Sequence, residues 1–169
     1  MKKITLILAF IGMITLQGCT VNEDINNGID NDTISQVFEY SNVNFVPNSF
    51  TSVLVFPRPI FNSDMVLVYR LSGVFQGEDV WKLLPESYYF PDGTLDLRYD
   101  FDFTRFDAEI SMQGFDLLSV SPGFRLNQVF RVVVIPGFFA NKNAVNLNDY
   151  KAVIEAYGID ESKMIKTKL

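Results

Sequence analysis

Leu95-Asp96-Leu97-Arg98-Tyr99-Asp100-Phe101-Asp102-Phe103-Thr104 is the stretch of this chain that decides its fold. An apolar or aromatic residue alternates with a polar one at every step. A period of two is typical of a β-strand that buries one face and exposes the other to water. Because most of the polar positions are aspartates, we expect the exposed face of this strand to be acidic.

The segment that follows, Phe106–Gln113, alternates in the same way, but its apolar phase is shifted relative to the first strand. A phase shift between two strands requires a bulge, a bend or a turn, here at Thr104-Arg105. Tight two-residue hairpin turns favour Gly and Asn, and neither is present. The sequence therefore favours a bulge or bend at this point.

Two other runs, Met65–Leu71 and Val129–Ile135, are apolar on both alternating faces, with Arg70 and Arg131 as the exceptions. Such runs are typical of central strands that are covered on both sides. Shorter strands are expected at Val53–Phe56 and Val80–Leu84.

One helix is predicted, at about residues 147–157. Its apolar positions step by three or four residues along the chain: Leu147, Tyr150, Val153, Ile154 and Tyr157. This spacing places them on one face of a helix. Asn146 or Asn148 suits the N-cap, and Gly158 suits a left-handed stop. We expect the helix to cover an open sheet face, and the last residues, Asp160–Leu169, to be frayed.

These elements predict a mainly β fold: an antiparallel β-sandwich or open barrel with one C-terminal helix. The β-rich part is expected to be a single domain over residues 33–169. All seven prolines fall between the strand runs, where a missing amide donor does least harm.

The N-terminus has the pattern of a secretory signal. Lys2 and Lys3 precede the apolar run Ile4–Leu16, and a small residue, Gly18, stands before Cys19. The run is too short to span a bilayer, which takes roughly 18 residues or more. Cleavage after residue 18 would leave about 150 residues, the length of one domain. Residues 19–32 are rich in Asn, Asp and Gly and are expected to form a disordered linker.

The ending Leu16-Gln17-Gly18-Cys19 resembles the lipobox of bacterial lipoproteins. The resemblance implies that Cys19 is lipidated with acyl chains such as palmitate and becomes the new N-terminus. Several acyl chains anchor a protein far more firmly than one. Thr20 is not the aspartate that such proteins use for inner-membrane retention. The resemblance thus implies the outer membrane, at its periplasmic face or at the cell surface.

The middle of the chain, over most of residues 37–158, is similar to a family of small bacterial lipoproteins that have a β-rich domain and no settled activity. The resemblance lies in these segments: Val37–Tyr40, Val66–Leu71, Val80–Pro85, Tyr88–Phe90, Tyr99–Thr104, Phe130–Pro136 and Asn148–Tyr150. Some relatives carry a collagen-like stalk, which this chain lacks. Others bear the name dihydrolipoamide dehydrogenase, which does not fit this chain because it has no Gly-x-Gly-x-x-Gly turn and no cysteine pair.

Composition excludes several classes of function. The chain has no histidine, and its one cysteine is the expected lipid site, so a Ser-His-Asp or Cys-His device is excluded. The formal net charge is −6, and no basic stripe offsets it, which argues against a nucleic-acid partner. We therefore expect no enzyme. The leading hypothesis is a non-enzymatic binding or structural module of the cell envelope, with a protein or a glycan as partner.

Two sets of residues are candidate sites for the alternative hypotheses. Asp96, Asp100 and Asp102 share one strand face and are speculative calcium ligands, since calcium takes 6–8 oxygen ligands. A calcium-dependent adhesin or, less favoured, a carboxylate-based carbohydrate-active enzyme would use these carboxylates. Aromatic residues are the candidates for stacking on a glycan: Trp81, Tyr88, Tyr89, Phe138 and Phe139. Core packing is the ordinary role of aromatic residues in strands.

Overall fold

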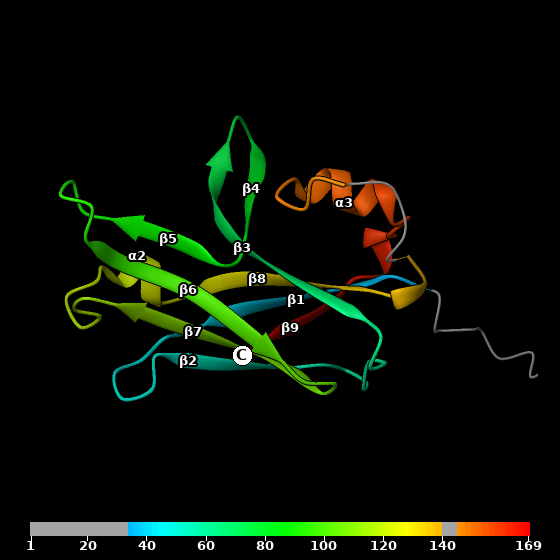
Figure 1. Cartoon of the computed structure of the whole chain (residues 1–169), viewed down its shortest axis with the longest axis horizontal. Helices are drawn as coiled ribbons and strands as arrows, with labels where there is room; N and C mark the ends of the chain where they lie inside the picture. The colour runs from blue at the N-terminus through cyan, green and yellow to red at the C-terminus, as the bar shows by residue number, and fades with distance from the viewer. Residues whose placement is uncertain (1–33, 140–144) are drawn as a thin grey trace, which may run out of the picture.

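The computed structural model describes residues 34–139 and 145–169 and shows two open β-sheets packed face to face (Figure 1). The strands are β1 (Gln36–Val43), β2 (Thr51–Val55), β3 (Met65–Phe75), β4 (Glu78–Leu83), β5 (Glu86–Tyr89), β6 (Leu95–Phe103), β7 (Asp107–Gly114), β8 (Gln128–Ile135) and β9 (Ile165–Lys168). One sheet has the order β4-β3-β8-β1-β9, and the other has the order β2-β7-β6-β5. The predicted antiparallel sandwich is confirmed, and both of its sheets are open.

The helical elements of the described ranges are short. They are α2 (Pro122–Arg125), the 3₁₀ turn η2 (Gly137–Phe139), α3 (Tyr150–Ala156) and the 3₁₀ turn η3 (Glu161–Lys163). None of the described helices is long and apolar enough to cross a membrane.

The alternating stretch Leu95–Phe103 is β6, and its two faces differ as predicted. Leu97 and Tyr99 are fully buried between the two sheets, whereas Asp96, Asp100 and Asp102 lie on the outer face. Leu54 of β2 and Ile110 of β7 join the same sandwich core.

Strands β3 and β8 lie side by side in the larger sheet and are covered on both faces, as predicted. Val68 and Val132 point into the sandwich core. On the other face, Tyr69 and Val133 belong to a second core that includes Tyr150 and Val153 of α3. The helix near the C-terminus therefore covers the second side of the central strands.

The bulge or bend expected at Thr104-Arg105 is a hairpin turn instead. β6 and β7 pair directly, with Phe103 opposite Ala108, and the turn spans Thr104–Asp107. The Thr104 hydroxyl donates to Asp107 Oδ1 at 2.6 Å and accepts from the Phe106 amide at 3.0 Å. The prediction was wrong because side-chain hydrogen bonds from Thr and Asp stabilise a turn that lacks Gly and Asn.

The helix is shorter than predicted, and a different residue caps it. Asp149 is the N-cap, and its side chain accepts from the Ala152 amide at 3.1 Å. Asn148 and Asn146 bond to each other instead. The left-handed stop is as predicted, with Gly158 at φ +61°.

The C-terminal residues expected to be frayed are ordered. Residues 161–163 form η3, and β9 pairs with β1, the one parallel pairing among the described strands. Lys166 of β9 reaches Glu39 of β1 at 3.2 Å. A strand of four residues is too short to show a clear alternation in the sequence. Its pairing with β1 and the ion pair to Glu39 stabilise it in the fold.

The shorter strands β2 and β4 lie close to their predicted ranges. The sequence alone does not predict the bounds of β1 and β5. The end of the β3–β4 hairpin projects from the sandwich on the same side as α3 (Figure 1). Gln76 and Gly77 both have positive φ and form its tight turn. The hairpin and the helix thereby form two walls around the outer face of the larger sheet.

Candidate functional site

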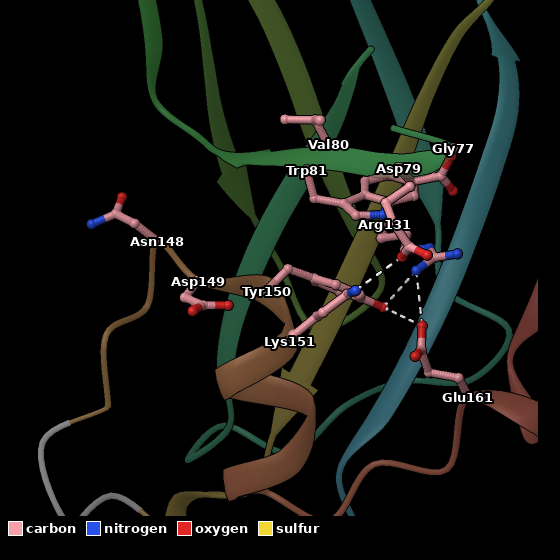
Figure 2. Close-up of a pocket in the computed structure, with 11 residues that line it drawn as sticks. Gly77, Asp79, Val80, Trp81, Arg131, Asn148, Asp149, Tyr150, Lys151 and Glu161 are labelled. Atoms are coloured by element: carbon pink, nitrogen blue, oxygen red, sulfur yellow. Dashed lines mark hydrogen bonds and ion pairs between the residues drawn. The ribbon is translucent and has the colours of Figure 1, made fainter. Parts of the chain in front are cut away.

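A cleft of about 730 Å³ lies between the β3–β4 hairpin and α3, and we refer to it as the β4–α3 cleft. Four parts of the chain line it: Gly77–Trp81 of the hairpin, Arg131 of β8, Asn148–Lys151 at the start of α3, and Glu161 of η3. Figure 2 shows Trp81, Tyr150 and Glu161 around Arg131, whereas Asn148 and Asp149 lie farther from it. The volume lies within the range of about 300–1,000 Å³ that is usual for ligand pockets.

Arg131 forms the floor of the cleft, because its position in β8, opposite Tyr69, directs it toward the helix side of the sheet. Its Nε donates to Glu39 Oε2 at 3.0 Å, and its Nη1 donates to Glu161 Oε1 at 2.8 Å. The guanidinium carbon lies 4.1 Å from the ring centre of Trp81. A cation over an indole face is a favourable contact. The guanidinium is thus fixed in one orientation.

Charge and hydrogen bonding keep Arg131 ionised despite its burial. Burial alone would lower its pKa, but the neighbouring Tyr150 and the hydrogen bond to Glu39 outweigh this effect and raise the pKa. A permanent cation therefore lies beneath the cleft.

Tyr150 supports the same floor from the first residue of α3. Its hydroxyl donates to Glu161 Oε1 at 2.8 Å and accepts from Arg131 Nη1 at 3.0 Å. Burial raises the pKa of Tyr150 well above its usual range, although the charge of Arg131 opposes the shift. The hydroxyl therefore stays protonated at neutral pH and acts as a structural donor. It does not serve as a base.

The rim of the cleft is more exposed. Lys151 Nζ lies 2.9 Å from Glu78 Oε2, and this ion pair links the helix to the hairpin across the opening. Asp149 is engaged in capping α3. The Asp79 carboxylate has no hydrogen-bond or ion-pair partner in the described part of the chain.

Two donors at the cleft are available to a ligand. Within the described ranges, no hydrogen bond engages the Trp81 indole N–H or the Arg131 Nη2. Neither atom is among the buried polar atoms without a partner, which are Ser35 Oγ, Asp64 Oδ1 and Arg98 Nε. Both donors therefore retain some exposure to solvent, and both belong to residues that line the cleft.

A second cavity, of about 560 Å³, lies between the start of β1 and the segment that follows α3. Phe38, Ile159 and Ile165 contribute to its lining, along with polar residues such as Asp160 and Lys163. It lacks the hydrogen-bonded floor that characterises the β4–α3 cleft.

The aspartates proposed as calcium ligands lie along the outer face of β6, away from the cleft. Arg98 Nη2 bonds Asp100 Oδ2 at 2.6 Å, and Asp102 lies opposite Glu109 of β7. Among the described residues, no group of three or more His, Cys, Asp or Glu side chains is placed to hold a metal ion. Calcium binding by Asp96, Asp100 and Asp102 stays a prediction without a preformed site to support it.

The structure does not bring the five candidate aromatic residues together. Trp81 lines the cleft, and Tyr88 is engaged inside the sandwich with Arg70 and Phe124. Tyr89 and Phe138 are exposed at separate places. Phe139 packs against Tyr157 at 6.2 Å between ring centres.

Sequence reasoning missed most of the residues that form the cleft. Tyr150 was assigned to the apolar face of the helix, and Lys151 and Glu161 carried no signal. Arg131 did carry one, because a lone charge in an otherwise apolar central strand needs a buried partner or a polar pocket.

Cys19, the expected lipidation site, lies outside the described residues. Comparisons with protein-family models, curated proteins and solved structures find no match for this chain.

Proposed function

We propose that this protein is a non-enzymatic binding module of the cell envelope, attached to the outer membrane through lipid on Cys19, and that its ligand binds in the β4–α3 cleft. The observation that carries the proposal is the arrangement of Arg131, which is fixed between Glu39, Glu161 and Trp81 at the floor of an open cleft. A fixed donor beside an accessible aromatic ring is a preorganised recognition surface.

The chemistry of the cleft supports binding over catalysis. The chain has no histidine, and Tyr150 is held protonated. Three of the four carboxylates have partners: Glu161 pairs with Arg131, Asp149 caps the helix N-terminus, and Glu78 forms an exposed ion pair with Lys151. General acid–base catalysis needs a group that can exchange its proton with the substrate. The paired carboxylates Glu161 and Asp149 instead hold Arg131 and the start of α3 in place.

Binding in the cleft can be tested by co-sedimentation of the purified protein with envelope fragments from which detergent has removed the lipid, so that the anchor on Cys19 cannot sediment the protein. Asp79→Arg and Lys151→Glu reverse charges at the rim without disturbing a buried contact, because both side chains are exposed. Asp102→Arg, on the outer face of β6, is the matched control. We expect the two cleft variants to lose most of the sedimented fraction and the control to retain it.

The proposal is wrong if Asp102→Arg abolishes sedimentation and the two cleft variants do not. If the wild-type protein released a chemically altered fragment from the envelope material, the proposal that it is not an enzyme would be wrong.

The lipid anchor has its own test. Replacing Cys19 by Ser removes the thiol to which lipid would be attached. In the Asp79→Arg background, where cleft binding is lost, we expect the Cys19→Ser protein to leave the membrane fraction, since an acidic chain has little attraction for anionic lipid. Continued membrane association of this variant would contradict the anchor.

A further inference from the structure

We propose that the β4–α3 cleft takes a neutral, hydroxyl-rich saccharide. This inference rests on the proposed function and names the class of ligand. Three properties of the cleft support it: its hydrogen-bonding groups, its compensated charges and its aromatic surface.

The available hydrogen-bonding groups suit a ligand that both donates and accepts. Trp81 Nε1 and Arg131 Nη2 are donors without a partner in the described ranges. Asp79 is an acceptor without one, and Glu161 Oε2 is not engaged by the bonds to Arg131 and Tyr150, which both use Oε1. A sugar hydroxyl donates one hydrogen bond and accepts others, so a single saccharide unit can satisfy both kinds of group.

The charges at the floor are compensated within the fold. Arg131 contacts two carboxylates, Glu39 and Glu161, and Glu39 also pairs with Lys166. At the rim, Lys151 is paired with Glu78. No uncompensated cation remains to attract an anionic ligand, and the acidic Asp79 and Asp149 at the edge repel a polyanion.

The aromatic surface disfavours a cationic ligand. The guanidinium of Arg131 already lies over the Trp81 ring, at 4.1 Å, and a second cation on the same indole would be repelled by it. Tyr150 also packs against this ring, at 5.6 Å between ring centres. The part of the indole that Arg131 and Tyr150 leave uncovered is apolar, with a polar N–H at its edge. Such a surface matches a sugar ring, whose C–H face is apolar and whose hydroxyls project from the ring edge.

Trp81 is the only tryptophan of the chain, so its fluorescence reports on the cleft alone. The purified protein is titrated with neutral cello-, manno- and galacto-oligosaccharides. Anionic oligogalacturonate, cationic chitosan oligosaccharides and a short zwitterionic peptide serve as comparison ligands. We expect a saturable change in Trp81 emission with at least one neutral series and none with the charged ligands at the same concentration.

Variants measured by calorimetry locate the contact. Trp81→Ala should weaken binding of the responding saccharide about tenfold, the size of one strong aromatic contact. Asp79→Asn changes an exposed, unpaired side chain and should weaken binding about fivefold while the protein remains folded. Tyr89→Ala removes an aromatic residue that is exposed away from the cleft and should change nothing.

The outcomes separate this inference from the function on which it rests. A saturable response to a charged oligomer or to the peptide, with none to a neutral saccharide, overturns the ligand class while cleft binding stands. If no ligand gives a response while the cleft variants still lose co-sedimentation, the proposal of a saccharide ligand is also overturned. Co-sedimentation that is indifferent to those variants overturns the proposed function itself.

Discussion

Arg70 of β3 and Arg131 of β8 lie on neighbouring strands of one sheet, and their side chains leave opposite faces of it. Arg131 stands opposite Tyr69, and Arg70 stands opposite Phe130. Arg70 points into the sandwich core, where its Nε donates to Glu86 at 2.8 Å and its guanidinium carbon lies 4.7 Å from the Tyr99 ring centre. The two arginines therefore have different roles, one internal to the sandwich and one at the cleft.

We predict that breaking the Arg70–Glu86 pair strongly destabilises the fold. Both side chains are almost completely buried, at 4% and 6% exposed. Glu86→Leu leaves the buried Arg70 without a carboxylate, and Arg70→Met leaves Glu86 with only Lys82 and Tyr88. Breaking a buried pair in this way costs about 3–5 kcal/mol. The double variant should cost clearly less than the sum of the two. Denaturant unfolding of the three variants measures these free energies, and strictly additive effects would contradict the pairing.

We also predict that Glu86 makes the stability depend on pH. Burial alone would raise the pKa of Glu86, but hydrogen bonds from Arg70 and Tyr88 outweigh it and lower the pKa. The group is thus harder to protonate in the folded state than in the unfolded one, where its pKa is about 4.3. Its contribution is complete above that value and is lost as the pH falls through the lower, folded pKa.

The measurement is the free energy of unfolding as a function of acidic pH for the wild-type protein and Glu86→Gln. The wild-type curve should fall more steeply, because only this protein has the carboxylate. Identical slopes for the two proteins would show that Glu86 does not contribute.

We predict that Asp149 sets the start of α3. Asp149→Ala removes the bond to the Ala152 amide and should lower the free energy of unfolding by about 1 kcal/mol. Asn148→Ala is the control, because the Asn148 side chain bonds only to Asn146 and caps no helical amide. Thermal or denaturant unfolding distinguishes the two. Equal effects of the two substitutions would argue against the cap.

We predict that β9 protects β1. Deleting Ile165–Leu169 removes the parallel pairing with Phe38–Ser41 and the ion pair from Lys166 to Glu39. Hydrogen exchange of the β1 amides should speed up, whereas that of β6 should not change, because β6 lies in the other sheet. Unchanged exchange in β1 would mean that β9 is not stably paired.

The sandwich was predictable because burial acts on every second residue of a strand. The alternation around Tyr99 and the doubly apolar runs of β3 and β8 record that burial directly in the sequence. The helix was predictable for the same reason, since Tyr150 and Val153 lie on one face. Its cap was not, because Asn146, Asn148 and Asp149 are all suitable N-cap residues.

The cleft was less predictable because it depends on tertiary contacts between distant segments. Arg131, Trp81 and Glu161 come from three elements that are far apart in the sequence, and no spacing rule connects them. The β9 strand is similar, since its four residues gain their structure from pairing with β1. Arg70 and Arg131 were visible as exceptions in apolar strands, but which face each one occupies depends on the register of the sheet.

Hydrogen exchange of the purified protein, with and without the envelope fragments that sediment it, tests directly whether the ligand binds in the β4–α3 cleft. If the ligand binds in the β4–α3 cleft, exchange should slow at residues 77–82 and 148–161 and should not change along β6. Protection of β6, or of neither region while the protein is bound, would contradict the assignment of the cleft as the binding site.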